Sequence, residues 1–374
     1  MSKLQELIQK FCPDGVEFKR LGDQQVCVMQ RGTVITKNNI ITGEIPVIAG
    51  GKNPAYYCNQ ANRTGETITI AGSGAYAGFV SYWNTPIFVS DAFSIKGAEL
   101  CSTKYLYYLL LNMQDKIYAT KKGAGIPHVH IKDVENFKIP IPHLEVQNEI
   151  VRILDTFTSH TAELQAELQA RKEQYEYYRN KLLTFDKDDK DVEWKNLPEI
   201  CENFDKKRKA VTASNRISGP YPYYGASGIV DYVNSYIFEG NYLLISEDGA
   251  NLLARSTPIA FSISGKNWVN NHAHILKFDN IFTQKYIEHY INMIDVSPYI
   301  SGGVQPKLNQ ENLNKIPIPI PSLFEQQRIV SILNKFETLV NDLTEGLPAE
   351  IAAVQEQYEY YRNKLLSFPK IKES

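Results

Sequence analysis

The chain has 374 residues, of which 43% are hydrophobic and 22% charged, and its formal net charge is -2. This length predicts two or more domains. Phosphate contacts from lysine and arginine dominate the affinity of proteins for nucleic acid, so a near-neutral chain would need partners to hold DNA firmly. No apolar run approaches the roughly 18 residues of a membrane span, and the N-terminus is amphipathic rather than signal-like, which predicts a cytoplasmic protein without membrane contact.

An internal duplication is the most informative feature of the chain. Residues 174–185 read QYEYYRNKLLTF and residues 357–368 read QYEYYRNKLLSF, so eleven of twelve positions recur at an offset of 183. Upstream of each copy lie similar pairs at an offset of 179, which are IVRILDTF from 150 with IVSILNKF from 329, and IPIP from 139 with IPIP from 318. A period near 180 residues is too long for a solenoid, so each repeat is a domain followed by a helix.

The segment from 19 to 137 shows almost no similarity to the segment from 195 to 316. Similar helices with divergent domains favour a rigid scaffold that carries two variable, function-bearing domains. Each domain is predicted to mix α and β structure, with short strands at 67–71, 79–82 and 86–89, and at 242–245, 258–263 and 274–278. A helix should follow in each, at 104–116 and 284–293, and then a glycine-rich loop, from Gly123 and from Gly302.

The stretch between the two variable segments predicts one long helix. From Ile150 to Leu182 a mainly apolar seam recurs in steps of four and three, the 3.5-residue period of a coiled coil, with Thr161 and Arg171 as polar interruptions. The sequence Ala-Glu-Leu-Gln occurs twice in succession, from 162 and from 166, and each such unit lengthens a helix by about one turn. A seam of this length extends roughly 50 Å at 1.5 Å per residue, so the helix is expected to act as a spacer.

The second helical copy contains four more residues than the first, beside Gly346 and Pro348. Such an insertion is a stutter, and proline cannot donate to the helical ladder, so a kink or short break is predicted at Gly346. Leu343 is expected on the apolar face before it. The two helices should pair antiparallel within the chain, although a homodimeric coiled coil is the alternative, and the predicted interface consists of Phe157, Leu164, Leu168, Tyr175, Tyr178, Leu182, Phe336, Val340, Tyr358, Tyr361 and Leu365.

Taken together, these motifs resemble the specificity subunits of type I restriction-modification systems. The resemblance covers the whole chain and rests on the two helical copies, the Ala-Glu-Leu-Gln tetrads, the paired IPIP segments, the N-terminal CPDGVEFKRLGD and the GGVQPKLN stretch from Gly302. It implies an α+β fold with two mixed α/β target-recognition domains separated by two long antiparallel coiled-coil helices. The implied boundaries are 1–143 for the first domain, 144–185 for the central helix, 186–321 for the second domain and 322–374 for the C-terminal helix.

The resemblance also implies partners. Each domain would read one half of a bipartite double-stranded DNA target, and the helices would dock two modification subunits that methylate adenine. S-adenosylmethionine would be bound by those subunits, and ATP and Mg by restriction subunits that join the complex. This chain would hold no cofactor or metal and would have no catalytic residue.

Two alternatives remain, an adenine methyltransferase and a helical adaptor without DNA specificity. Asn53-Pro-Ala-Tyr is one residue from the methyltransferase signature Asn-Pro-Pro-Tyr, and Gly72-Ser-Gly-Ala-Tyr-Ala-Gly follows a strand as a cofactor loop does. Ala55 replaces the second proline, and no Rossmann-like unit can be traced, so we interpret both segments as turns. The pairs His128-x-His130 and His272-x-His274 lack further ligands for a tetrahedral metal site and are interpreted as polar loop or strand residues.

Candidate DNA contacts were selected by residue type and position. Basic runs suit phosphate contacts, whereas polar and charged groups on loops suit base edges. The phosphate candidates are Lys121, Lys122, Lys206, Lys207, Arg208 and Lys209. The candidates for reading bases are Ser73, Tyr76, Asn84, Glu247, Asp248, Asn251, Arg255 and Asn271.

Overall fold

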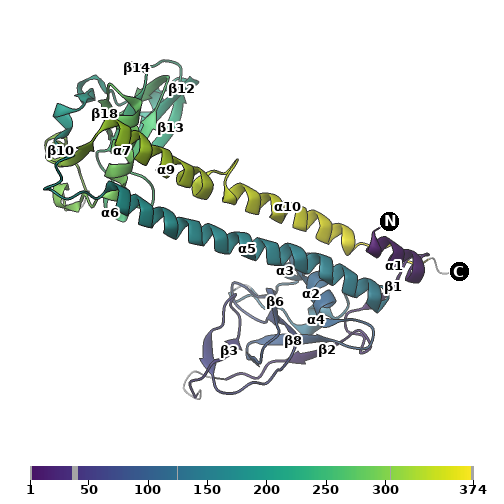
Figure 1. Ribbon diagram of the computed structural model, residues 1–374. Helices are drawn as coiled ribbons and strands as arrows, with labels where there is room; N and C mark the ends of the chain where they lie inside the picture. Colours follow the sequence, from purple (N-terminus) through teal and green to yellow (C-terminus); the bar gives the residue numbers. More distant parts are fainter. Residues whose placement is uncertain (1, 36–40, 124, 304, 372–374) are drawn as a thin grey trace. The chain divides into compact units, whose positions relative to one another are not determined.

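A computed structural model describes residues 2–35, 41–123, 125–303 and 305–371 of the chain (Figure 1). The chain forms two compact units. Unit 1 consists of Met1–Leu164 with Ile351–Ser374, and unit 2 consists of Gln165–Glu350. The central helix α5, Leu144–Leu183, contributes its first part to unit 1 and its last part to unit 2. Within the described residues, no helix is both long and apolar enough to span a bilayer.

Unit 1 is built on two small sheets. The four-stranded sheet has the order β2-β8-β5-β6, and the three-stranded sheet has the order β4-β3-β7. Strands β1 and β9 form a separate antiparallel pair. The strands are β1 (Glu17–Arg20), β2 (Cys27–Arg31), β3 (Ile45–Ile48), β4 (Tyr56–Cys58), β5 (Thr67–Ala71), β6 (Val80–Trp83), β7 (Phe88–Val89), β8 (Ala92–Gly97) and β9 (Lys138–Ile141). The helices besides α5 are α1 (Lys3–Phe11), α2 (Thr103–Asn112), α3 (Gln114–Tyr118), α4 (Ile131–Val134) and α10 (Leu347–Leu365).

Unit 2 has two four-stranded sheets, with the orders β11-β18-β15-β16 and β13-β12-β17-β14, and an antiparallel pair β10-β19. The strands are β10 (Val192–Lys195), β11 (Glu202–Asn203), β12 (Ser218–Gly225), β13 (Gly228–Val233), β14 (Phe238–Glu239), β15 (Tyr242–Ser246), β16 (Ala260–Ile263), β17 (Lys266–Val269), β18 (Ala273–Lys277) and β19 (Ile318–Pro321). The helices are α6 (Asn251–Ala254), α7 (Ile281–Met293), α8 (Gln310–Leu313) and α9 (Leu323–Asn341).

The duplication includes the divergent domains. The order β2-β8-β5-β6 in unit 1 matches β11-β18-β15-β16 in unit 2, and in the second sheets the parallel pair β3-β7 matches β12-β17. The hydroxyl of Tyr105 in α2 donates to the carbonyl of Pro140, and the hydroxyl of Tyr286 in α7 donates to that of Pro319. Both units therefore share one topology, although their sequences in this region differ almost completely.

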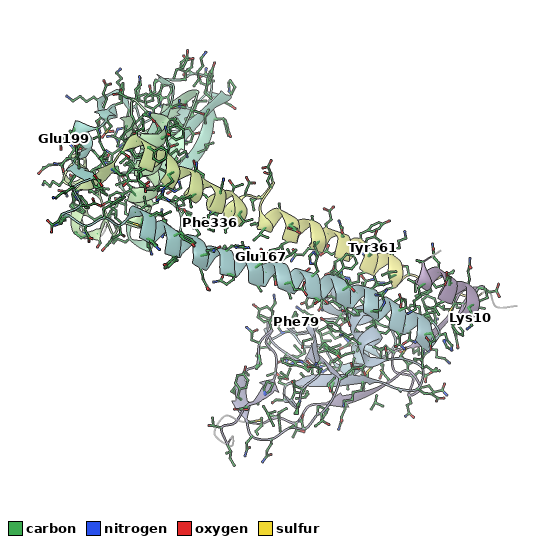
Figure 2. The ribbon with its side chains drawn as sticks, in the orientation of Figure 1. Lys10, Phe79, Glu167, Glu199, Phe336 and Tyr361 are labelled. Carbon is green, nitrogen blue, oxygen red and sulfur yellow. The ribbon has the colours of Figure 1, made fainter. Side chains whose placement is uncertain are left out.

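The predicted coiled-coil seam is present in both units (Figure 2). In unit 1, the Phe157 ring of α5 stacks on Tyr361 of α10, with centroids 5.6 Å apart. In unit 2, the Tyr178 ring of α5 stacks on Phe336 of α9 at 5.7 Å. Because α5 runs without interruption, the continuous helix predicted from the sequence is confirmed.

The predicted break in the second helical copy is also confirmed. Helix α9 ends at Asn341 and α10 begins at Leu347, so residues 342–346 interrupt the copy. A Cβ on Gly346 would lie 2.5 Å from the carbonyl oxygen of Thr338, so the tight turn requires glycine. The expectation for Leu343 was wrong, because the break removes this side chain from the helix face and leaves it 79% exposed.

The other predicted interface positions are buried to different degrees. Leu164 and Val340 are 6% and 2% exposed. Tyr175 packs against Phe336, and Tyr358 against Phe157. Leu168, Leu182 and Leu365 are half-buried, whereas Tyr361 is 40% exposed although its ring stacks on Phe157.

Candidate nucleic-acid interface

Each unit joins the loop after its central strand to the glycine-rich hairpin by the same hydrogen bonds. In unit 1, Gly74 donates to the carbonyl of Pro127 at 3.0 Å, and Val129 donates to that of Gly72 at 3.0 Å. In unit 2, Gly249 donates to the carbonyl of Pro306 at 3.1 Å, and Leu308 donates to that of Glu247 at 2.8 Å. The glycine-rich loops predicted after the helix of each domain are thus part of the repeat.

Glycine is required at the corners of this arrangement. Gly74 and Gly249 have φ of 83° and 111°, and the hairpin glycines Gly123 and Gly302 have φ of 109° and 88°. Residues with a Cβ rarely adopt these values. Four backbone corners are therefore held in the same conformation while the side chains between them differ, as expected of two surfaces with one shape and two specificities.

In unit 1 the loop after β5 collects four of the predicted DNA contacts. Ser73 donates a hydrogen bond to the carboxylate of Asp91, Tyr76 is 45% exposed, and the Lys121 ammonium lies 3.3 Å from the carbonyl oxygen of Ala75. The Lys122 ammonium is paired with Asp133.

Asn84 lies elsewhere in unit 1. It follows β6, which runs antiparallel to β5 so that Trp83 pairs with Thr67, and this places Asn84 at the opposite end of β5 from Ser73. The structure thus brings Ser73, Tyr76, Lys121 and Lys122 together and leaves Asn84 apart.

The same end of unit 1 presents a lysine that the sequence reasoning missed. The Lys52 ammonium lies 5.2 Å from the ring centroid of Tyr76, and Lys52 is exposed. The sequence could have indicated this lysine, because it follows Gly50-Gly51, and paired glycines mark a turn whose next side chain is exposed.

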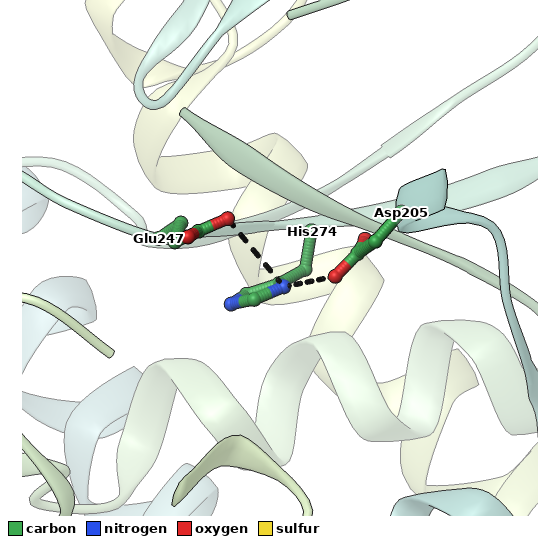
Figure 3. Close-up of side chains that lie close together, drawn as sticks. All are labelled: Asp205, Glu247 and His274. Atoms are coloured by element: carbon green, nitrogen blue, oxygen red, sulfur yellow. Dashed lines mark hydrogen bonds and ion pairs between the residues drawn. The ribbon is translucent and has the colours of Figure 1, made fainter. Parts of the chain in front are cut away.

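Unit 2 contains a buried ion-pair network that includes the predicted residues Arg208 and Glu247, and Figure 3 shows Glu247 with Asp205 and His274. The Arg208 guanidinium lies 2.6 Å from the Glu247 carboxylate and 3.4 Å from that of Asp205. His274 lies between the two carboxylates, with Nδ1 2.6 Å from Asp205 and 3.9 Å from Glu247. Lys307 adds a further ion pair to Glu247 at 3.1 Å.

Two carboxylates and an imidazole within 4.8 Å of one another have the composition of a metal site. However, both ring nitrogens of His274 are engaged, Nδ1 with Asp205 and Nε2 with the carbonyl of Leu308 at 2.7 Å. Burial acts to raise the pKa of Asp205, but the hydrogen bond and charge of His274 and the charge of Arg208 outweigh it and lower that pKa. These contacts support a structural role as an ion-pair network.

Several residues predicted to contact DNA have structural contacts instead of free side chains. Glu247 is 8% exposed, and burial acts to raise its pKa, but Arg208, His274 and Lys307 lower it. The Arg255 side chain is also engaged within the protein. Its Nη2 lies within hydrogen-bonding distance of three carbonyl oxygens at the end of α7, including that of Ile291 at 3.1 Å.

Asn251 bonds within its own loop, where its side chain contacts Ser256 and Thr257. Asp248 holds His272 at 2.9 Å, which matches the contact between Ser73 and Asp91 in unit 1. In unit 2 the exposed side chains among the predicted set are Lys206, Lys207, Lys209 and Asn271, and the Lys207 ammonium lies 4.7 Å from the ring centroid of Phe204. Contact of any of the predicted residues with DNA stays a prediction.

The segments considered for a methyltransferase are turns. Residues 53–55 lie between β3 and β4, and Gly72 begins the loop after β5. A Cβ on Gly72 would lie 3.2 Å from the Asp91 carboxylate, which is tighter than most Cβ contacts, so close packing favours glycine here.

Comparison with known proteins identifies the family. The family model for the type I restriction modification DNA specificity domain matches twice, at residues 13–174 and 189–353. The specificity subunit of the type I restriction enzyme EcoR124I/EcoR124II from Escherichia coli is 33% identical over 413 residues, covering 99% of this chain and 98% of that protein.

Solved structures agree on the fold. The crystal structure of the type I restriction-modification S subunit from M. genitalium matches with a TM-score of 0.66 at 18% identity, covering 94% of this chain and 96% of that one. The HsdS subunit from Thermoanaerobacter tengcongensis matches with a TM-score of 0.51 at 18% identity, covering 95% and 97%. The chain therefore belongs to the specificity subunits of type I restriction-modification systems, whose part in the complex is DNA recognition rather than catalysis.

Proposed function

We propose that each unit reads one half of a bipartite DNA target, the first with residues from 1–143 and the second with residues from 186–321. The support is the candidate interface built twice on one backbone pattern with different side chains. A common backbone gives both units a similar pose on the duplex, and different side chains present different donors and acceptors to base edges. Lys52 and Lys121 in unit 1, and Lys206, Lys207 and Lys209 in unit 2, would contact phosphates.

We further propose that the helical segments 144–185 and 322–374 dock two modification subunits at equivalent sites. The observation that carries this proposal is the recurrence of exposed residues in the helical copies. Tyr177 and Tyr360 are 58% and 60% exposed, yet identical. Their exposed neighbours recur too, Glu176 with Glu359, Asn180 with Asn363 and Lys181 with Lys364.

Within the chain, the Tyr177 and Tyr360 rings contact the adjacent tyrosine and a lysine on the same helix. Such surface contacts do not by themselves require identical residues, so the identity points to another cause. A partner present in two copies is such a cause, because it meets the same surface twice. Tyrosine is enriched among the residues that carry most of the binding energy of protein interfaces. The pair Tyr177 and Tyr360 is therefore the proposed centre of the two docking sites.

The chemistry of the complex is assigned to its partners. The modification subunits would bind S-adenosylmethionine and methylate the target, and the restriction subunits would use ATP and Mg. We place the complex in the cytoplasm, where bacterial DNA is accessible.

Docking is tested by replacing Tyr177 and Tyr360 with alanine, singly and together. Purified complexes assembled with the modification subunits are analysed by native mass spectrometry. We expect two modification subunits per wild-type chain, a largely empty altered site in each single variant and two largely empty sites in the double variant, at the lowest concentration that saturates the wild type, since losing a central tyrosine costs about 2 kcal/mol, roughly 30-fold in affinity. Tyr232→Ala is the matched control, because Tyr232 is 51% exposed on β13, outside the helices. A double variant that still binds two subunits contradicts the proposed docking site.

DNA reading is tested by methylome sequencing of cells that express the modification subunit with or without this chain. A methylated bipartite motif that depends on the chain is the expected result. Methylation of the same motif without the chain would show that sequence recognition resides elsewhere.

A further inference from the structure

Unit 1 contains a basic pocket of about 380 Å³ on one face of its four-stranded sheet. Its lining includes two cationic side chains, Arg63 and Lys96, and no carboxylate. The other lining residues are Val28, Gln30, Ala61, Asn62, Thr64 and Ser94. Lys96 is tethered by a hydrogen bond from its ammonium to the carbonyl of Thr64.

The Arg63 side chain forms the inner wall of this pocket and is only 9% exposed. It donates to Ser94 Oγ at 2.7 Å, to the carbonyl of Asn62 at 2.7 Å and to that of Arg31 at 2.9 Å. All three acceptors are neutral, and burial alone lowers the pKa of the guanidinium. Among the described residues, none forms an ion pair with Arg63, whereas buried charges in proteins are ordinarily paired.

A guanidinium has five N–H donors, and three of those of Arg63 are used. Two donors and one positive charge therefore remain at the wall of an open pocket. Such a group matches an oxyanion, because arginine can offer two parallel hydrogen bonds to a phosphate or carboxylate.

Unit 2 shows that the fold does not require this arrangement. The strand pairing aligns Thr69 with Leu244, because each occupies the same place in the central strand and pairs with both neighbours. On that alignment the polar positions Arg63, Thr69, Ser81 and Ser94 of unit 1 correspond to Phe238, Leu244, Phe261 and Ile275 of unit 2. These four apolar residues belong to one hydrophobic cluster. One unit thus fills this face with hydrocarbon, and the other holds an unpaired arginine there.

We propose that the Arg63–Lys96 pocket of unit 1 binds a backbone phosphate of the DNA, which supplies the counter-charge that Arg63 lacks in the free protein. The proposal rests on the proposed function, that unit 1 binds DNA. Unit 2 has no such site at the equivalent face, so the two units would hold the DNA backbone by different contacts. A phosphate contact orients a protein on the duplex but carries no sequence information, so this site contributes affinity and not specificity.

The test uses the complete complex with its modification subunits and measures binding to target and non-target duplexes by fluorescence anisotropy at several salt concentrations. The first variant is Lys96→Gln. We expect several-fold weaker binding to both duplexes, and a decrease of about 0.9 in the slope of log affinity against log salt, the value for one lost phosphate contact. Lys138→Gln is the matched control, because Lys138 is an exposed lysine of β9 outside the pocket, and it should leave the slope unchanged.

The second variant, Gln30→Glu, separates a phosphate site from a structural arginine. Gln30 lines the pocket and pairs with Ser94 across β2 and β8, so a carboxylate there supplies the missing counter-charge. We expect this variant to melt at the same or a higher temperature than the wild type, yet to bind both duplexes more weakly than Lys96→Gln.

Wild-type affinity and salt slope in both variants, with normal melting, overturn the proposal. So does a pocket that takes free anions only, which would appear as stabilisation of the wild type by inorganic phosphate, lost in Gln30→Glu, without an effect on DNA binding. If instead the wild-type complex fails to bind its target duplex, the proposed function fails, and this outcome is read from the wild type alone.

Discussion

Lengthening α5 should lengthen the gap between the two halves of the DNA target. The perturbation is one more Ala-Glu-Leu-Gln unit inserted after Gln169, within the tetrad repeat. Four residues add about 6 Å of helix and rotate the following residues by about 40° around the helix axis, so both units can still face the DNA. At 3.4 Å per base pair this corresponds to one or two base pairs.

The second connection between the units can accommodate this change. Phe157 and Tyr178 of α5 contact Tyr361 and Phe336, respectively. Between these contacts α5 is unbroken, whereas the other connection contains the break at 342–346. Five extended residues reach about 16 Å at 3.3 Å each, more than twice their helical length, so the break can supply the additional 6 Å.

Methylome sequencing of cells carrying the insertion variant provides the assay. Both half-sites should be unchanged, with one or two more nonspecific positions between them. A variant that assembles and methylates normally with an unchanged gap would refute the reasoning, because the helix would then not set the distance.

Three further predictions follow from the two-unit structure. Replacing residues 19–137 with a different recognition domain should change one half of the methylated motif only, and a change in both halves would contradict independent reading. Tyr178→Asp combined with Tyr361→Asp places charge in stacked aromatic contacts and should abolish soluble assembly, as measured by gel filtration; a normal complex would show that the seam does not hold the helices together. The hydrogen bond from Arg152 lowers the pKa of Glu149 from 4.5 to about 2, so Glu149 stabilises the fold fully above pH 4.5 and loses this effect as the pH falls towards 2. The melting temperature of Glu149→Gln should therefore lie below that of the wild type at neutral pH and approach it below pH 4.5, and a difference independent of pH would exclude the charge as its cause.

The sequence was most informative where the same side chain serves packing in both units. The period of the seam predicted α5, and the four extra residues beside Gly346 predicted the break, because coiled-coil packing links sequence spacing directly to geometry. The strand at 67–71 was predicted with its full bounds. In contrast, the predicted helix at 104–116 is two helices, α2 and α3, that meet at Met113.

Most of the second sheet of each unit was not predicted, apart from β7, which lies within the strand expected at 86–89. Strands β3, β4, β12 and β13 mix glycine, proline and exposed tyrosine, so they lack the clear apolar alternation by which a strand is recognised. The shared topology of the units was also not visible, because strand pairing depends on backbone hydrogen bonds that most side chains permit.

At the candidate site, the direction of the side chains could not be predicted from the sequence. Loop position was the basis for choosing the candidate residues of unit 2, but it does not indicate where each side chain points. Arg208 and Glu247 lie in loops and still turn inward to each other, and Arg255 caps α7. The direction of a side chain in a loop depends on partners far away in the sequence, such as His274 for Asp205, and no local pattern reports them.

Residues 366–371 complete unit 1 around Val16, and this has a consequence for protein synthesis. Leu366 belongs to the same hydrophobic cluster as Leu4 and Val16, and Val16 donates a backbone hydrogen bond to Pro369. Unit 2, by contrast, is one continuous segment. A ribosome that makes this chain from its N-terminus therefore releases all of unit 2 before unit 1 can close, and the unit begun first is finished last. A chain that stops early would expose the apolar surface of unit 1, the feature by which chaperones and proteases recognise incomplete products.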